Sequence, residues 1–256
     1  MRSRRFNAIR EMDAVLPAIE AVLLPLGFVR ADNVFHRRSD ADVLPRVEAV
    51  TLGLAYGFRT CWLHVTVKVP ALIELLSAVR PFAYSKALAW QVPDYASHVA
   101  CMLRLSELGA AGAAPLPDGI RWREDGRLQR ARRVTAETLG ATMASLVEHY
   151  ALPALRDRLT LRGLAAAADT PGYERSGVAG AWPLAARLAL GDVAGAERAF
   201  RAHPYSLGSD RARVATAKAW LKGCGVAVGD VAWSQEAADV GDPWDARAWL
   251  TGELLP

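Results

Sequence analysis

The sequence has few cysteines, and no stretch of it stays apolar for long. Its 256 residues include three cysteines, an odd and small number that argues against a disulfide framework and for a reducing compartment. No run reaches the roughly 18 uninterrupted apolar residues that a membrane-spanning helix needs. Glu11, Asp13 and Glu20 interrupt the basic and apolar N-terminus, so we do not expect a secretory signal. We expect a cytoplasmic protein with no membrane partner.

The common catalytic and phosphate-binding motifs are also missing. The sequence contains no G-x-S-x-G, no G-x-x-x-x-G-K-S/T and no H-E-x-x-H. Gly223, Gly225 and Gly229 miss the spacing of a dinucleotide-binding loop by one residue, and no β-rich run precedes them. These absences predict a protein that is not an enzyme and that binds no cofactor.

Two short patterns have the residue types of a zinc site. Cys61-x-x-His64 and His98-x-x-Cys101 each combine a thiol with an imidazole. Both patterns fall on expected strands, where residues three apart point to opposite faces of the sheet. Neither pair can then bind a single metal ion. We expect packed thiols and polar-face histidines, and no metal.

The residues that are present are typical of a folded protein. Apolar residues make up 52% and charged residues 23%, which argues against wholesale disorder. The 31 Lys and Arg against 27 Asp and Glu give a formal net charge of +4, too small to require a polyanionic partner. A chain of this length buries about three quarters of its unfolded surface, enough for one large or two smaller domains.

The clearest local pattern is EAVTLGLAYGFRTCWLHVTVKV at residues 48–69. Apolar and polar residues alternate with the period of a strand on both sides of Gly57 and Phe58. A two-residue loop that begins with Gly favours a type II′ hairpin turn. Pairing Tyr56 with Arg59 then gathers the apolar residues of both strands on one face and places Gly53 beside Trp62 on the other.

This other face of the hairpin, together with its tip, is the expected binding surface. It combines aromatic and charged side chains with small ones, and aromatic and Arg anchors dominate the affinity of many protein interfaces. The candidate partner-binding residues are Tyr56, Phe58, Arg59, Trp62, His64 and Lys68. The alternative is that the later helices cover this face and that the tip residues pack as an ordinary loop.

The N-terminal part predicts an antiparallel sheet with helices. An amphipathic helix precedes Gly27, its αL cap, and Pro17 bends or divides it. The other elements of this part are short strands at residues 28–30 and 34–38, a helix at 71–79 and a strand at 98–105. With the long hairpin they make an α+β sheet domain of four to five strands over residues 1–133.

From Thr135 onward the apolar period changes to that of helices. Two helices joined by Gly191 and Asp192 resemble one tetratricopeptide hairpin, and packing positions fall at Ala194, Ala196 and Phe200. No neighbouring copy follows, so we expect a helical region at residues 134–256, packed against the sheet domain, and not a solenoid.

Six arginines crowd between residues 121 and 133, at Arg121, Arg123, Arg127, Arg130, Arg132 and Arg133. Such a run could meet phosphates, but acids lie nearby and Trp122 is its only aromatic residue. The sequence favours a solvated linker over a nucleic-acid-binding segment.

The order of features resembles an uncharacterised bacterial family, domain-of-unknown-function number 4304, over about residues 6–165. The matching positions are Leu26, Gly27 and Phe28, then Arg37, then Arg104 and Leu108, then Asp118 and Trp122. Arg123 stands where a second Trp is common in that family. The resemblance implies an α+β domain and supplies no reaction, cofactor or catalytic residue.

Together these observations favour a non-enzymatic protein-binding module, an immunity-type protein that binds and neutralises a toxin or effector. Two alternatives stay open. One is an enzyme of unrecognised type that uses His64 or His98 in a cleft between sheet and helices. The other is an RNA-associated accessory protein that uses the arginines of residues 121–133.

Overall fold

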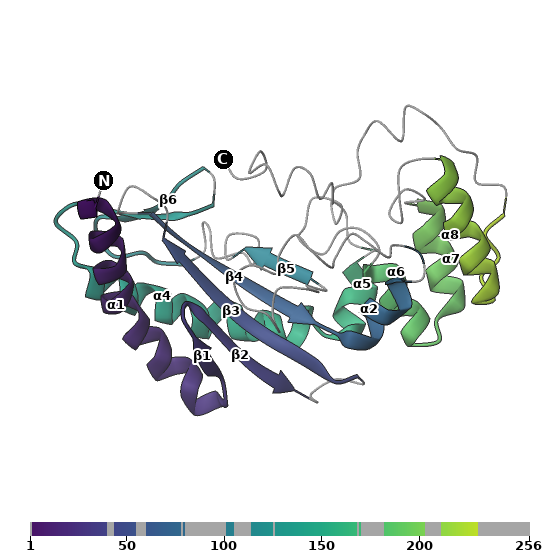
Figure 1. Ribbon diagram of the computed structural model, residues 1–256, viewed down its shortest axis with the longest axis horizontal. Coiled ribbons are helices and arrows are strands. Elements are labelled where there is room, and N and C mark those ends of the chain that lie inside the picture. Colours follow the sequence, from purple (N-terminus) through teal and green to yellow (C-terminus); the bar gives the residue numbers. More distant parts are fainter. Residues whose placement is uncertain are drawn as a thin grey trace. The chain divides into compact units, whose positions relative to one another are not determined.

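The α+β architecture predicted from the sequence is confirmed by a computed structural model of the chain (Figure 1). The structure describes residues 2–39, 44–54, 60–77, 79, 101–104, 114–124, 126–167, 169, 182–202 and 211–229. The chain forms two units. The sheet unit comprises Met1–Ser39, Val47–Val67 and Met102–Asp157, and the helical unit comprises Asp40–Arg46, Lys68–Cys101 and Arg158–Pro256. The predicted division at residue 133 stays a prediction.

The described strands form one antiparallel sheet in the order β1-β2-β3-β4-β7-β6, with β5 also paired to β4. The strands are β1 (Val29–Ala31), β2 (Val34–Ser39), β3 (Arg46–Leu54), β4 (Thr60–Lys68), β5 (Cys101–Arg104), β6 (Ile120–Trp122) and β7 (Leu128–Arg130). The sheet thus has seven strands where the sequence predicted four to five. The additional strands β6 and β7 lie inside the arginine-rich run, so its interpretation as a solvated linker is wrong.

The first hairpin joins β1 to β2 through a turn at Asp32 and Asn33. Asp32 adopts a left-handed φ of 53°, a conformation that Asp tolerates better than most residues. Val29 pairs with His36 and Ala31 with Val34. The side chain of Asn33 then binds the carbonyl of Leu52 on β3, and the Leu52 N–H donates to the Asn33 carbonyl at 3.0 Å. This exchange fixes the register of β2 against β3.

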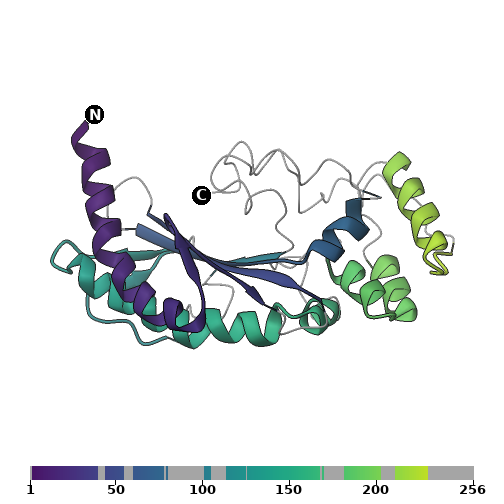
Figure 2. The same cartoon turned by 60° about the horizontal axis from the view of Figure 1, so that its bottom comes forward.

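Helices α1 (Arg2–Leu23) and α4 (Ala136–Leu146) cover one face of the sheet. Figure 2 shows α4 and the C-terminal half of α1 on the same side of the strands. Pro17 is exposed and does not divide α1, which continues to Leu23 and ends with a short 3₁₀ turn before Gly27, whose φ is 81° as predicted for the cap. Thr135 is the N-cap of α4, since its hydroxyl accepts from the N–H of Thr138 at 3.2 Å.

The helical backbone continues beyond α4 to Arg158 with two π-helical turns, Val147–Ala151 and Ala154–Arg158. Pro153 lies between them. Proline has no N–H to donate and its ring crowds the preceding turn, so a regular α-helix cannot pass through this position unchanged. The wider π turns on either side accommodate it. On the core side of this helix, Leu139, Met143, Leu146 and Val147 are buried and Tyr150 is half-buried.

The helical unit confirms the predicted C-terminal helical region. Its helices are α2 (Pro70–Ser77), α5 (Leu161–Ala167), α6 (Trp182–Ala189), α7 (Val193–Ala202) and α8 (Arg211–Gly223). Helices α6 and α7 form the predicted hairpin around Gly191, whose φ is 75°. Ala196 and Phe200 are fully buried as predicted, but Ala194 is exposed. Residues 196 and 200 are four apart and share one helix face, whereas residue 194 lies on the opposite face.

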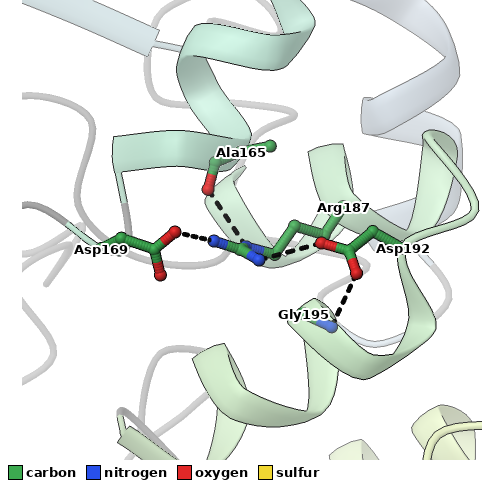
Figure 3. Close-up of polar contacts among 5 residues, drawn as sticks. All are labelled: Ala165, Asp169, Arg187, Asp192 and Gly195. Atoms are coloured by element: carbon green, nitrogen blue, oxygen red, sulfur yellow. Dashed lines mark hydrogen bonds and ion pairs between the residues drawn. The ribbon is translucent and has the colours of Figure 1, made fainter.

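Arg187 joins three segments of the helical unit (Figure 3). Only 4% of it is exposed. Its guanidinium donates to the carbonyl of Ala165 at 3.1 Å and pairs with Asp169 at 2.5 Å and with Asp192 at 2.9 Å. Asp192 also accepts from the N–H of Gly195 at 2.8 Å and so caps α7. The two carboxylates and the carbonyl compensate the buried guanidinium of Arg187, so we assign this cluster a structural role.

Candidate functional site

The long hairpin of β3 and β4 has two unlike faces, as predicted. Cys61, Leu63, Val65 and Val67 are at most 2% exposed, whereas the residues between them are half-buried. The thiol of Cys61 lies 3.6 Å from the sulfur of Met143 on α4. The face with the buried side chains is therefore the one that α1 and α4 cover. We call the opposite face of the sheet unit the second face.

Trp62 and His64 form an aromatic pair on the second face. Their rings stack with centroids 4.4 Å apart and planes inclined by 30°. The indole of Trp62 also lies against Gly53, because a Cβ atom at residue 53 would collide with its six-membered ring. The predicted neighbours Gly53 and Trp62 are thus confirmed. The small residue on β3 makes room for the large one on β4.

The structure brings together part of the predicted binding set. Trp62 and His64 lie side by side, and Lys68 is half-buried at the last position of β4. The tip residues Tyr56, Phe58 and Arg59 lie outside the described residues. The site that can be built is therefore centred on Trp62 and not on the tip.

The arginine-rich run contributes residues that the sequence did not assign to this site. β7 pairs with β4 through Thr60 and Gln129, and β6 pairs with β7 through Arg121 and Gln129. Residues opposite each other in an antiparallel pair point to the same face, so Arg121 and Gln129 lie on the second face with Thr60. Trp62, two positions after Thr60 on β4, lies on the same face.

Two further arginines, Arg123 and Arg127, lie next to these paired residues. The β4–β7 pairs end at Cys61 and Leu128, and just beyond them the N–H of Arg123 donates to the carbonyl of Arg127 at 2.8 Å. Extending the alternation of both strands by one residue assigns Arg123 and Arg127 to the second face. The sequence held a signal for this arrangement, since I-R-W-R and R-L-Q-R alternate on either side of Asp125 and Gly126. Two such short runs around an Asp-Gly turn are typical of a hairpin.

Charge is distributed unequally between the two faces. Glu48 is the one carboxylate among the described strand residues. It lies on the covered face, 1% exposed, where it binds Arg37 at 2.7 Å. The described strand positions of the second face in the sheet unit carry Arg38 and Arg121. Arg123 and Arg127 flank the β6–β7 turn, which also holds the exposed carboxylate of Glu124. The described strand positions of this face are therefore basic and aromatic.

The ionisable groups that the structure describes near the hairpin do not gather around one point. Burial raises the pKa of Cys61 to about 12, so its thiol stays protonated at neutral pH. Cys61 and His64 point to opposite faces, as the sequence predicted. His98 and the side chain of Cys101 lie outside the described residues. Within the described part of the chain no three His, Cys, Asp or Glu side chains gather around one point.

His36 is the second histidine of this face. Its neighbour on β1 is Val29, and it lies on the opposite side of β2 from the buried Phe35. Burial lowers the pKa of His36, so the neutral imidazole predominates at pH 7. The permanent charge of the second face therefore comes from the arginines.

Comparison of the chain with known protein families, with curated proteins and with solved structures gave no match. The resemblance to the family of domain-of-unknown-function number 4304 stays a prediction. No described helix is both long and apolar enough to span a membrane, and cytoplasmic localisation also stays a prediction.

Proposed function

We propose that the protein is a non-enzymatic protein-binding module, an immunity-type protein that binds and neutralises a toxin or effector through its second face. The observation that carries the proposal is the Trp62 and His64 pair, half-buried on a sheet face beside a row of arginines. Trp and Arg are enriched among the residues that dominate binding energies. A rigid sheet presents them with little ordering cost on binding.

The residues of the second face support binding better than catalysis. General acid–base chemistry needs a carboxylate or a second titrating group within reach of the histidine. Glu48 lies on the covered face, so the described strands place no carboxylate beside His36 or His64. The enzyme alternative gains no support from this arrangement.

The RNA alternative gains one specific observation. Arg121, Arg123 and Arg127 share a face with Trp62, and proteins that bind single strands combine basic with aromatic residues. An RNA-associated accessory protein is therefore the second candidate function.

The proposal is tested with the protein that the gene immediately upstream encodes, by co-expression and size-exclusion chromatography. We expect a one-to-one complex and loss of that protein's toxicity. Trp62→Ala removes the central anchor and should weaken the complex by about 30-fold or more, as for other buried aromatic anchors. Trp220→Ala is the matched control, because Trp220 is also half-buried but belongs to α8.

Both variants are first compared by thermal unfolding, so that loss of fold is not taken for loss of contact. Absence of a complex, or equal affinities for the two tryptophan variants, would count against the proposed function. Salt-sensitive binding of RNA in place of the protein would favour the accessory role.

A further inference from the structure

We infer that Gly53 and His64 are positioning residues that hold the indole of Trp62 in one orientation, and that the partner binds the ring in that orientation. This inference rests on the proposed function and assigns His64 a role that acts through Trp62. The observation behind it is that two residues, one from each strand of the long hairpin, contact the same ring.

Gly53 restrains one edge of the ring. A Cβ atom at residue 53 would lie 2.0 Å from Cε2 and Cζ2 of Trp62 and 2.6 Å from Cη2, closer than Cβ atoms in proteins approach other heavy atoms. These three atoms follow one another along the indole, so this edge lies across the backbone of β3 at Gly53. Any side chain at residue 53 would displace the ring.

The backbone conformation of Gly53 does not itself require glycine. Its φ lies outside the left-handed region that Gly27 and Gly191 adopt, so other residues could take the same conformation. Glycine inside a strand weakens that strand, and it often marks a place where another group approaches closely. The contact with Trp62 therefore accounts for the glycine at this position.

His64 restrains one face of the ring. The two rings stack with their centroids 4.4 Å apart. Residues two apart on a strand are separated by about 7 Å, so the rings lean towards each other and close the space between the two side chains. The indole is therefore confined at one edge by β3 and on one face by the imidazole.

This confinement matters for binding, because an anchor that is already ordered costs less free energy to dock. Trp62 is half-buried, so part of its ring stays open to a partner. The orientation of the ring decides which part that is. Without the ring of His64 the indole gains freedom that binding must remove, and with a side chain at residue 53 it presents a different surface.

The first test follows the ring in the full chain labelled with 5-fluorotryptophan. The fluorine is bound to Cζ3, which is not one of the three atoms nearest to residue 53. Loss of a signal in Trp62→Phe identifies the resonance of Trp62. We expect one such resonance in the wild type, shifted or split in Gly53→Ala and in His64→Ala. Gly223→Ala is the control, because a Cβ there meets nothing within 4 Å.

The second test measures affinity for the protein that the gene immediately upstream encodes. Gly53→Ala should weaken the complex about as much as Trp62→Ala does. The two changes together should add little, because both remove the same anchor. His64→Ala should weaken the complex by about three- to tenfold, the cost of ordering one more side chain on binding.

Two further variants separate the ring of His64 from its nitrogen atoms. His64→Phe keeps a stacking ring, and its affinity should stay within about twofold of the wild type. His64→Asn keeps polar atoms without a ring and should behave as His64→Ala does.

Thermal unfolding of each variant is compared first. If Gly53→Ala does not fold, Gly53→Ala combined with Trp62→Ala removes the colliding ring and should restore the fold. A double variant that is no more stable than Gly53→Ala would contradict the contact on which the inference depends.

An unchanged Trp62 resonance in both Gly53→Ala and His64→Ala would overturn the inference, as would equal losses of affinity in His64→Phe and His64→Ala. The proposed function still stands in that case if Trp62→Ala disrupts the complex with the upstream-encoded protein. If the wild-type chain forms no such complex, both proposals fail.

Discussion

The reactivity of the Cys61 thiol tests which face of the β3–β4 hairpin is buried. It points into the core beside Met143, and burial raises its pKa to about 12. Because the thiolate is the reactive form, we predict that iodoacetamide at pH 8 labels native Cys61 far more slowly than the half-buried Cys224. Peptide mass spectrometry checks this. Comparable native rates, with both cysteines equally reactive in denaturant, would contradict the assigned strand register.

The same shift of the Cys61 pKa has a consequence for stability. In the unfolded chain a thiol loses its proton near pH 8.5, while the folded chain keeps it until about pH 12. The unfolded state then binds fewer protons, so the free energy of unfolding falls as the pH rises between these values. Urea titrations at pH 8 and pH 10 should show part of this loss in the wild type, and Cys61→Ala should lack that contribution.

At the scale of the element, the contact between α1 and α4 depends on one glycine. A Cβ at Gly140 would lie 3.0 Å from the carbonyl oxygen of Val15 and 3.1 Å from its Cα. Both atoms belong to the backbone of α1, so the helix itself would have to move. We predict that Gly140→Ala lowers the free energy of unfolding by about 1–2 kcal/mol, although alanine favours a helix.

The control for this prediction is Gly223→Ala at the end of α8, where a Cβ meets nothing within 4 Å. This change should be neutral or slightly stabilising in the same urea titration. A Gly140→Ala variant at least as stable as Gly223→Ala would show that α1 and α4 are less closely packed than the structure indicates.

The elements that the sequence predicted well are those whose pattern is long and one-sided. β3 and β4 each span nine residues, and β4 alternates strictly between buried and half-buried positions, so helix α4 could only cover the face of Cys61, and Trp62 had to lie on the other. β6 and β7 have three residues each, and their second-face positions are the polar residues Arg121 and Gln129. A strand this short and this charged shows no clear alternation of apolar residues. The face to which Arg121 belongs can be assigned only from the pairing with β4.

At the scale of the whole molecule, the chain is divided so that neither unit is continuous in sequence. The sheet unit takes in Met102–Asp157 and with it α4, which lies beyond the predicted division at residue 133. Helix α4 buries Leu139, Met143 and Leu146. Residues 1–133 alone would therefore expose the part of the covered face on which α4 packs, and each large apolar side chain left in water costs about 1.5–3 kcal/mol.

We predict that residues 1–133 expressed alone give no cooperative unfolding transition, whereas residues 1–157, which hold all three segments of the sheet unit, unfold cooperatively. Circular dichroism during urea titration distinguishes the two, because cooperative loss of structure requires a complete core. A cooperative transition for residues 1–133, as stable as that of residues 1–157, would instead support an independent sheet domain ending there. In that case α4 would be an accessory to the sheet, and the burial of Cys61 would not depend on it.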